Sequence, residues 1–215
     1  MTTRVCVING KGGCGKTTVS THLAAGLAAS GLNTLLVDLD RHRGASRWHK
    51  IRPKSAARVA LDDWKGDFGT VPKGTHRVII DCPASLRLPQ VREIVSESDL
   101  LIVPLLPSIF DQHATKLFLQ RLQKIKKVRS GRKEILIVHN RCRERSPASR
   151  QLDDYLADLG HEPFARISDR ALYPQLAAQG LTVFDGKTKA IQRLQEEWMP
   201  LIEEVEEIEA ASGSA

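Results

Sequence analysis

Five short stretches of the chain are apolar at almost every position, without alternation of polar and apolar residues. Such runs predict strands that are covered on both faces, as in a parallel sheet. The predicted strands are Arg4–Asn9, Thr34–Asp38, Arg77–Asp81, Leu100–Pro104 and Ile135–Asn140. Because helical patterns separate them, the order of elements predicts a doubly wound α/β domain, with a mainly parallel sheet flanked by helices.

Apolar residues at helical spacing predict the helices between these strands. The marker residues are Val19, Leu23 and Leu27 after a glycine-rich loop, and Leu117, Leu119 and Leu122 in a helix that opens at Ser108. Ser146 and Pro147 predict the cap and first turn of a further helix that runs to about Leu159. Residues 53–75, rich in Pro, Gly and Lys, are expected to be irregular.

A C-terminal helix is predicted to dock on the sheet, with an interruption at Pro200. Its apolar face consists of Ile191, Leu194, Trp198, Leu201, Ile202, Val205 and Ile208. Residues 1–208 are therefore expected to form one domain, and residues 209–215 a disordered tail. In composition, 41% hydrophobic and 27% charged residues are typical of a soluble globular protein.

No apolar run approaches the roughly 18 residues that cross a bilayer, and "MTTRVCVING" does not resemble a signal segment. We therefore expect a cytoplasmic protein. The four cysteines form no C-x-x-C pair, which argues against a disulfide framework and a zinc site.

The charge of the chain is unevenly distributed. All 32 Lys and Arg residues lie at or before Arg193, together with only 18 of the 25 acids. The seven remaining acids are glutamates between Glu196 and Glu209. Residues 1–193 are thus strongly basic, which favours a polyanionic partner such as nucleic acid.

The segment "NGKGGCGKTT", Asn9–Thr18, fits the phosphate-binding pattern G-x-x-x-x-G-K-[ST] between a predicted strand and a predicted helix. Its glycines let backbone N–H groups face a phosphate at a helix N-terminus. Lys16 is expected to reach the β- and γ-phosphates, and the Thr17 hydroxyl to ligate Mg²⁺. The residues expected to bind the nucleotide here are Gly12, Gly13, Cys14, Gly15, Lys16, Thr17 and Thr18.

The pattern does not require the earlier lysine, Lys11. It lies too early in the loop to reach the γ-phosphate of its own subunit easily. A cation there can instead project outward and neutralise the phosphates of a second subunit in a face-to-face dimer, as an arginine finger does. A solvated lysine is the alternative.

The segment "KGGCGKTT" resembles the deviant Walker A box of the ParA/MinD ATPases, whose signature lysine corresponds to Lys11. The resemblance covers about residues 3–208. It continues in "LLVDLD" (switch I), "VIIDCPAS" (Walker B and switch II), "SDLLIVPLLPSIFD" and "ARISDRALYPQLAAQGLTVFD". Because the chain is short, it is similar to the small ParF-like branch and related cargo positioners.

The resemblance implies roles for four residues beyond the loop. Asp40 would orient the attacking water and belong, with Thr17 and Asp81, to the metal site. Asp38 would support the switch, Asp81 would hold Mg²⁺ through a bound water, and Asn140 would contact the adenine. Lys11, Lys16 and Asp40 would be the catalytic residues.

The resemblance also implies an Mg²⁺-dependent ATPase that forms a homodimer on binding ATP and then binds DNA without sequence preference. A ParB-like or cargo-adaptor protein would stimulate hydrolysis. The cargo would be a plasmid, a chromosome region, a carboxysome or a chemoreceptor cluster, and the protein would be cytoplasmic and nucleoid-associated. The alternative within the family is a MinD-like regulator at the membrane surface. The glutamates of the C-terminal helix argue against stable membrane association.

Three other classes use related loops. An iron–sulfur carrier would need paired cysteines, and a bacterial tyrosine kinase would need a tyrosine-rich tail, whereas this chain contains only Tyr155 and Tyr173. An amide ligase or synthetase stays open.

One segment departs from the family pattern. The usual Asp-Pro-Gln-Gly after the switch I aspartate pair is replaced by Asp40-Arg41-His42-Arg43-Gly44. Arg41 and Arg43 have three open readings: contact with nucleotide, contact with DNA, or solvation.

Three basic groups are candidates for DNA binding, and the sequence does not rank them. They are Lys124–Lys133 on the edge opposite the nucleotide, Arg141–Arg150 on the nucleotide edge, and Lys187, Lys189 and Arg193 near the last helix.

Overall fold

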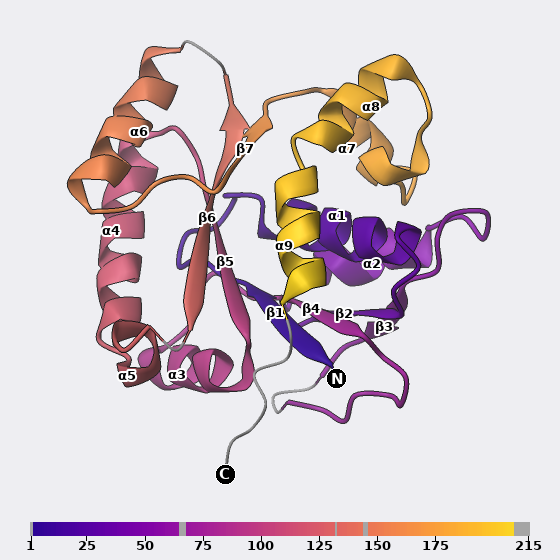
Figure 1. Cartoon of the computed structure of the whole chain (residues 1–215), viewed down its shortest axis with the longest axis horizontal. Coiled ribbons are helices and arrows are strands. Elements are labelled where there is room, and N and C mark those ends of the chain that lie inside the picture. Colours follow the sequence, from indigo (N-terminus) through magenta and orange to yellow (C-terminus); the bar gives the residue numbers. More distant parts are fainter. Residues whose placement is uncertain (1, 65–67, 132, 144–145, 209–215) are drawn as a thin grey trace.

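Seven strands form one sheet in which every pair is parallel (Figure 1). The computed structural model describes residues 2–64, 68–131, 133–143 and 146–208, and of residues 109–112 only the backbone. The order across the sheet is β3-β2-β4-β1-β5-β6-β7. The strands are β1 (Thr3–Val7), β2 (Thr34–Asp38), β3 (Ala60–Asp62), β4 (Arg77–Asp81), β5 (Leu100–Leu105), β6 (Glu134–Cys142) and β7 (Ala165–Ser168).

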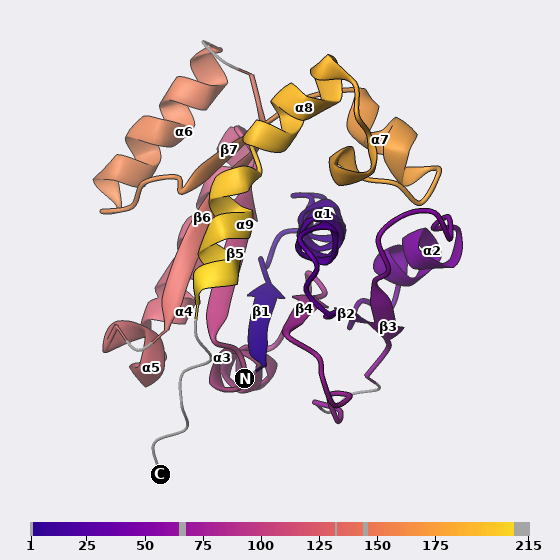
Figure 2. The same ribbon diagram turned by 45° about the vertical axis from the view of Figure 1, so that its right-hand side comes forward.

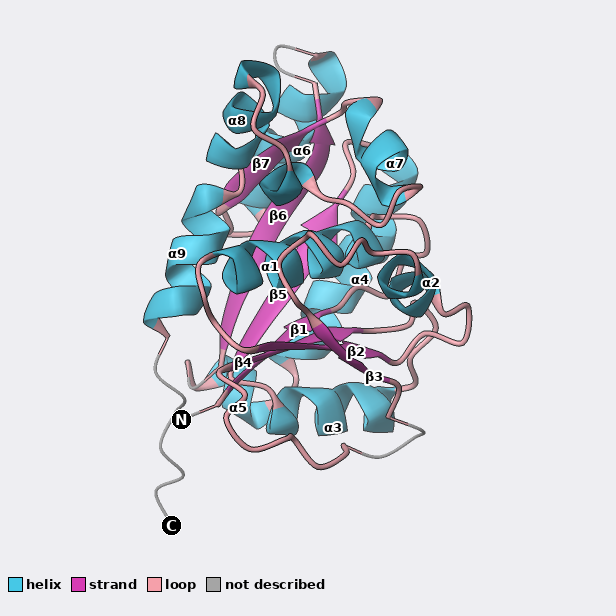
Figure 3. Cartoon of the chain, turned by 90° about the vertical axis from the view of Figure 1, so that its right-hand side faces the viewer, coloured by secondary structure: helices cyan, strands magenta, loops and turns pink. Residues whose placement is uncertain are grey.

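Helices cover both faces of the sheet, which is why the central strands are apolar throughout. Strand β1 shows the alternation: Val5 and Val7 belong to one buried cluster, Cys6 and Ile8 to the other. The first face is covered by α1 (Lys16–Ala29), α2 (Gly44–Lys50), α7 (Leu172–Ala177), η1 (Val183–Asp185), α8 (Lys189–Glu196) and α9 (Met199–Glu207). The second is covered by α3 (Leu88–Glu97), α4 (Ile109–Gln123), α5 (Lys126–Arg129) and α6 (Pro147–Asp158). Figure 3 shows α1 and α3 on opposite sides of the sheet.

All five predicted strands are present, within a few residues of their predicted ends. The two edge strands were not predicted. Strand β3 has three residues and lies inside the segment expected to be irregular, and in β7 exposed Arg166 separates buried Ala165 and Ile167. Short edge strands carry too few apolar positions to stand out from the surrounding loops.

The predicted buried face of α4 included one residue that is exposed. In α4, Leu119 and Leu122 are buried, but Leu117 is 44% exposed. The buried face also includes Thr115 and Phe118. These positions follow the helical spacing of three and four residues, and Leu117 falls on the outer side. The helices predicted at Ser108 and Ser146 begin with those residues as N-caps.

The predicted C-terminal helix consists of two helices, α8 and α9. Pro200 does not break a helix but lies in the first turn of α9, where its missing N–H is not needed. Trp198, Leu201, Ile202 and Val205 are buried in the cluster that also contains α1 and the sheet. The predicted docking is therefore confirmed.

The end of α9 is fastened to the starts of two central strands. Arg77 donates from Nε to the carbonyl of Val205 (2.7 Å) and from Nη2 to that of Glu206 (2.6 Å). The Thr3 hydroxyl donates to the carbonyl of Ile208 (3.0 Å). The guanidinium thus satisfies carbonyls that a helix end leaves unpaired. The tail predicted at residues 209–215 lies outside the described residues.

Within the described ranges, no helix combines the length and the apolar character needed to cross a membrane.

Candidate functional site

The polar residues singled out in the sequence meet at the carboxyl ends of β1, β2, β4 and β6. Strand β1 pairs with β4 on one side and with β5 on the other. The connection from β1 leads to β2 on the β4 side, whereas the connection from β4 crosses to β5 on the other side, so the strand order reverses at β1. Open parallel sheets bind ligands outside the carboxyl ends of their strands, at the point where the strand order reverses. The loop after β1 leads directly into α1, whose first residue is Lys16.

The glycine-rich loop needs glycine at two positions where the backbone is left-handed. Gly13 has φ 81° and Gly15 φ 92°. At Gly15 a side chain is excluded twice over, because a Cβ would lie 2.0 Å from Nδ2 of Asn140. Gly13 has open space where its Cβ would be, as expected of a loop that wraps a ligand.

Asn140 is 3% exposed and holds the loop in place. Its Nδ2 donates to the carbonyl of Cys14 (2.8 Å), and its Oδ1 accepts the N–H of Arg141 (2.9 Å). The structure therefore gives Asn140 a loop-bracing role that the sequence analysis did not anticipate. Contact with an adenine stays a prediction.

A second asparagine, which was not assigned a role, braces the other end of the loop. Asn9 donates to the carbonyl of Pro104 (2.8 Å) and accepts the N–H of Lys11 (3.0 Å). Its position at the strand end was visible in the sequence, but not its partners.

Lys16 is 6% exposed, and its ammonium donates to the carbonyl of Lys11 (2.9 Å). The same carbonyl accepts from the thiol of Cys14 (3.4 Å). A buried ammonium next to backbone N–H groups at a helix N-terminus is well suited to an anion. Lys11 is half-buried. Its action across a dimer stays a prediction, because the structure contains a single chain.

The Walker B candidate Asp81 lies against α1. Its carboxylate accepts from the hydroxyl of Thr17 (2.7 Å) and from that of Ser20 (3.1 Å). Burial, and after it the nearby Asp38 carboxylate, raise the pKa of Asp81 to about 7, against the opposing hydrogen bonds of Thr17 and Ser20. Ser20 was missed because a serine inside a helix gives no signal in a sequence.

Thr17 and Asp81 supply the hydroxyl and carboxylate oxygens that Mg²⁺ prefers. Among the described residues, no group of three His, Cys, Asp or Glu side chains could hold a metal ion. The residues present therefore fit an Mg²⁺ that completes its coordination with phosphate oxygens and water, rather than an all-protein metal cage.

Asp38 is buried and its carboxylate is well satisfied. It accepts the N–H of Asp40 (3.1 Å) and both the N–H and the hydroxyl of Ser46 (2.8 Å each). Asp38 and Asp81 are register partners on adjacent strands. The structure thus connects the switch I candidate to the first turn of α2 through Ser46. This role of Ser46 was not predicted from the sequence.

Asp40 is not part of the Thr17–Asp81 hydrogen-bond group. It is half-exposed, and its carboxylate accepts the N–H of His42 (2.9 Å) within a turn. Arg43 follows with a left-handed backbone, φ 54°, and pairs with Asp63 at 2.9 Å. The predicted metal contact of Asp40 therefore stays a prediction that requires the switch segment to move.

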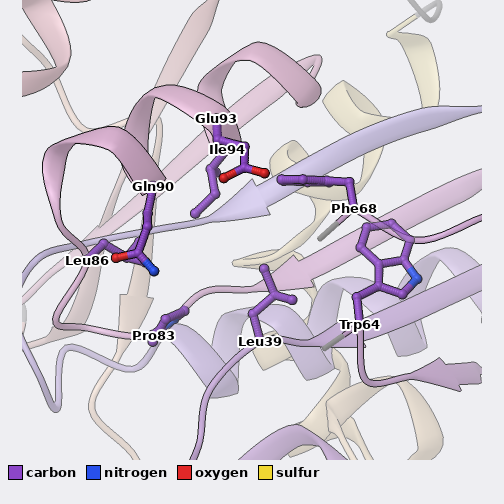
Figure 4. Close-up of a pocket in the computed structure, with 8 residues that line it drawn as sticks. All are labelled: Leu39, Trp64, Phe68, Pro83, Leu86, Gln90, Glu93 and Ile94. Carbon is purple, nitrogen blue, oxygen red and sulfur yellow. The ribbon is translucent and has the colours of Figure 1, made fainter. Parts of the chain in front are cut away.

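A small pocket of about 120 Å³ lies next to both switch segments, and Gln90 and Glu93 line it together with apolar side chains (Figure 4). Leu39 enters it from between Asp38 and Asp40, and Pro83 from two residues after Asp81. Trp64 and Phe68, from the segment expected to be irregular, line its other side. Since both switch segments pack into one space, a shift of either changes the surroundings of the other.

The far end of α2 is fixed by a buried ion pair. Arg52 and Asp185 form two hydrogen bonds of 2.8 and 2.9 Å, with side chains 5% and 7% exposed. Arg52 also donates to the carbonyls of Ala57 and Gly180 and lies 4.8 Å from the centroid of the Trp48 ring.

A buried histidine connects α1 to the C-terminal helices. The ring of His22 stacks on Trp198 (centroids 4.5 Å apart) and meets Tyr173 edge-on at 5.3 Å. Its Nδ1 lies 2.8 Å from the carbonyl of Thr18, a predicted nucleotide-binding residue. Burial lowers the pKa of His22 to about 4.

Two of the predicted basic groups lie at opposite edges, as expected. Lys127 and Lys133 donate to the carbonyls of Ser96 and Ser98 at the end of α3, which is the amino edge of the strands. The group Arg141–Arg150 spans the end of β6 and the start of α6. Three positions in these groups, 132, 144 and 145, lie outside the described residues.

Comparison with known proteins identifies what the chain is similar to. The family profile described as "CobQ/CobB/MinD/ParA nucleotide binding domain" matches residues 5–183. A curated relative, the maintenance of carboxysome distribution protein A of Halothiobacillus neapolitanus, is 29% identical over 187 residues, which is 84% of this chain and 86% of that protein.

Two solved structures show the same fold. One is a putative plasmid partition protein of Borrelia burgdorferi bound to AMPPNP: TM-score 0.70, 16% identity, and coverage of 95% of this chain and 100% of that one. The other is the septum site-determining protein MinD of Pyrococcus horikoshii with Mg-ADP: TM-score 0.64, 21% identity, and coverage of 96% and 97%. The predicted doubly wound fold is thereby confirmed.

Proposed function

The chain belongs to the CobQ/CobB/MinD/ParA family of nucleotide-binding domains, and from this premise we propose that it is a ParA-type, Mg²⁺-dependent ATPase. It binds ATP with the loop from Lys11 to Thr18 and hydrolyses it to ADP and phosphate. The observation that carries the proposal is the arrangement of buried Lys16, half-buried Thr17 and buried Asp81 at one helix N-terminus.

The chain's own residues account for the steps of nucleotide binding. Backbone N–H groups of the loop, held by Asn9 and Asn140, receive the phosphates. Lys16 would exchange the carbonyl of Lys11 for phosphate oxygens. Thr17 and Asp81 would hold Mg²⁺, which would supply positive charge next to the phosphates. The neighbours bound to AMPPNP and Mg-ADP support these ligands.

Hydrolysis requires a water aligned with the γ-phosphate. Asp40 orients this water once the turn at His42 rearranges, while Asp38 keeps its hydrogen bonds to Ser46 and fixes the start of α2. Lys11 projects to the phosphates of a second subunit. ATP therefore holds two chains face to face, and hydrolysis releases them.

The dimer binds duplex DNA without sequence preference, and a partner protein on the cargo stimulates hydrolysis. The basic charge of residues 1–193 supports DNA as the binding partner. The relative named for carboxysome distribution and the neighbour named for plasmid partition support a large cargo. The protein is accordingly proposed to be cytoplasmic and associated with the nucleoid.

A MinD-like membrane regulator is the alternative, suggested by the MinD neighbour. Four glutamates on α9, Glu203, Glu204, Glu206 and Glu207, weigh against it, because anionic lipid repels them.

The proposal is tested by binding to non-specific duplex DNA with ATP, with ADP and without nucleotide, across a salt series. The intact protein is compared with Lys11→Ala, and binding of a fluorescent ATP analogue is measured for both. We expect DNA binding that needs ATP, weakens with salt and is lost in the variant, with nucleotide binding retained. Equal DNA binding in every nucleotide state, or no DNA binding at all, would contradict the proposal.

A further inference from the structure

The segment from Arg41 to Arg58 contains seven Lys or Arg residues and no Asp or Glu. Two of the seven are paired: Arg43 with Asp63, and Arg52 with Asp185. The other five side chains belong to exposed residues, and together they are called the α2 basic surface. They are Arg41, Arg47, Lys50, Lys54 and Arg58.

Helix α2, which carries Arg47 and Lys50, lies on the flank of the molecule, beside α1 and below α7 (Figure 2). A hollow of about 230 Å³ on one side of α2 is lined by Arg47 together with Thr17 and Thr18. An open hollow of about 830 Å³, formed by the end of α2 and the segment that leads to β3, is lined by Lys54 and Arg58. Neither hollow has a carboxylate among the described residues that line it.

Two residues of the candidate nucleotide site, Asp38 and Thr17, contact the first turn of α2. The Asp38 carboxylate accepts the N–H and the hydroxyl of Ser46. Gly44 packs against Thr17 so closely that a Cβ would lie 3.2 Å from the threonine methyl group. Any ligand that moves Asp38 or Thr17 therefore moves the helix that carries Arg47 and Lys50.

The charges in this segment suit a nucleic acid better than an amphipathic peptide. Ile51, 51% exposed, is the one large apolar side chain exposed in the described segment 41–58, so a partner finds cations and little apolar surface. The cations extend from the switch segment along α2 into the loop before β3, which is the arrangement that a continuous phosphate backbone requires.

We propose that the α2 basic surface binds the phosphate backbone of duplex DNA, and that bound nucleotide sets its position through Asp38 and Thr17. This inference rests on the proposed function for DNA as the partner. It adds the surface, and it explains why the segment after the switch I aspartates is rich in arginine. The group Lys124–Lys133, in which Lys127 and Lys133 donate to backbone carbonyls at the amino edge of the strands, then serves as the comparison surface.

The test compares two variants with the same change in charge. One carries Arg47→Gln, Lys50→Gln, Lys54→Gln and Arg58→Gln. The control carries Arg121→Gln, Lys124→Gln, Lys126→Gln and Arg129→Gln, four exposed cations of α4, α5 and the residues between them. Each loses two Arg and two Lys, so the net charge is matched. Binding to a fluorescent DNA duplex is measured with ATP over a salt series, and binding of a fluorescent ATP analogue is measured in parallel.

We expect the α2 variant to bind DNA about tenfold more weakly or worse at moderate salt, and its salt slope to fall by about 0.9 for each phosphate contact removed. The control variant should resemble the intact protein, and all three should bind the ATP analogue equally.

Three results overturn the inference. If both variants lose DNA binding equally, the overall charge is responsible rather than this surface. If the α2 variant keeps DNA binding, this surface does not bind DNA; binding of both variants to polyglutamate, measured in parallel, then shows whether an acidic protein is its partner. If the intact protein does not bind DNA with ATP, the proposed function fails first. A variant with two substitutions and the same change in net charge, Lys54→Glu with Arg58→Glu in the loop, gives the same distinction should the fourfold variant not fold.

Discussion

The two ends of α2 are held in contrasting ways. At its far end, Arg52 and Asp185 are 5% and 7% exposed and share two hydrogen bonds, while Arg52 also donates to two backbone carbonyls. At its near end, the ion pair of Arg43 with Asp63 is a single contact between side chains that are 38% and 48% exposed. Buried, fully bonded pairs are rigid, whereas exposed ones contribute little.

This contrast shows how one short helix can serve a switch. The far end is fixed to the loop around Gly180 and to η1, so it provides a reference point. The near end depends on Asp38 and on a solvated ion pair, so it can follow the nucleotide. The elements that change in a switch are expected to have low local stability next to a stable support.

Breaking the fixed end should have the largest effect. Arg52→Ala leaves Asp185 buried without its charged partner and is expected to lower the free energy of unfolding by about 3–5 kcal/mol. Denaturant unfolding measures this change. In the double variant Arg52→Ala with Asp185→Ala, the loss should be clearly smaller than the sum of the single losses, because the orphaned charge is gone. Additive losses would show that the pair does not act as a unit.

The free energy of unfolding should also fall at acidic pH, because of the buried residue His22. Its pKa in the folded state is about 4, below the ordinary 6.5. The unfolded chain therefore takes up a proton below pH 6.5 while the folded protein does not, and stability is lost as the pH falls from 6.5 to 4. At pH 5 this one group accounts for about 2 kcal/mol.

His22→Phe keeps a ring against Trp198 and removes the titrating group. Among the described residues, Nε2 of His22 has no hydrogen-bond partner, so the one hydrogen bond that the substitution removes is that of Nδ1 to the carbonyl of Thr18 (2.8 Å). We expect the difference in unfolding free energy between pH 7.5 and pH 5 to shrink by about 2 kcal/mol in the variant. An unchanged difference would mean that the imidazole is not kept neutral by burial.

The smallest effect is expected at the near end. Asp63→Asn removes the charge partner of Arg43 while keeping the size of the side chain. Because the pair is exposed, the free energy of unfolding should change by less than about 1 kcal/mol, and less at high salt. A loss as large as that of Arg52→Ala would remove the contrast between the two ends of α2.

The sequence predicted the central part of the fold because burial on both faces leaves continuous apolar runs in β1, β2, β4, β5 and β6. It did not predict β3 and β7, which lie at the edges of the sheet: β3 has no buried residue, and β7 has two. Leu117 was wrongly predicted to lie on the buried face of its helix, because residue type alone does not distinguish an exposed leucine from the buried leucines near it.

For the site, the sequence predicted the loop because its glycines, lysine and threonine lie next to one another in the chain. The residues that hold the loop and α2 in place come from distant parts of the sequence: Asn140 donates to the carbonyl of Cys14, and Asp185 pairs with Arg52. Such partners are set by tertiary structure and have no fixed spacing. The same holds for Trp64 and Phe68, which meet Leu39 and Pro83 only in the folded chain.

The hydrogen bond from Thr3 to Ile208 has a practical consequence for labelling. It places the start of β1 beside the end of α9, at the edge of the sheet opposite the nucleotide loop. A fluorescent protein attached before Thr3 or after Ile208 would thus emerge from the same side, away from Lys11 and the α2 basic surface. The same proximity makes a circular permutant, with these two positions joined by a flexible linker and new ends in an exposed loop, a feasible probe of the switch.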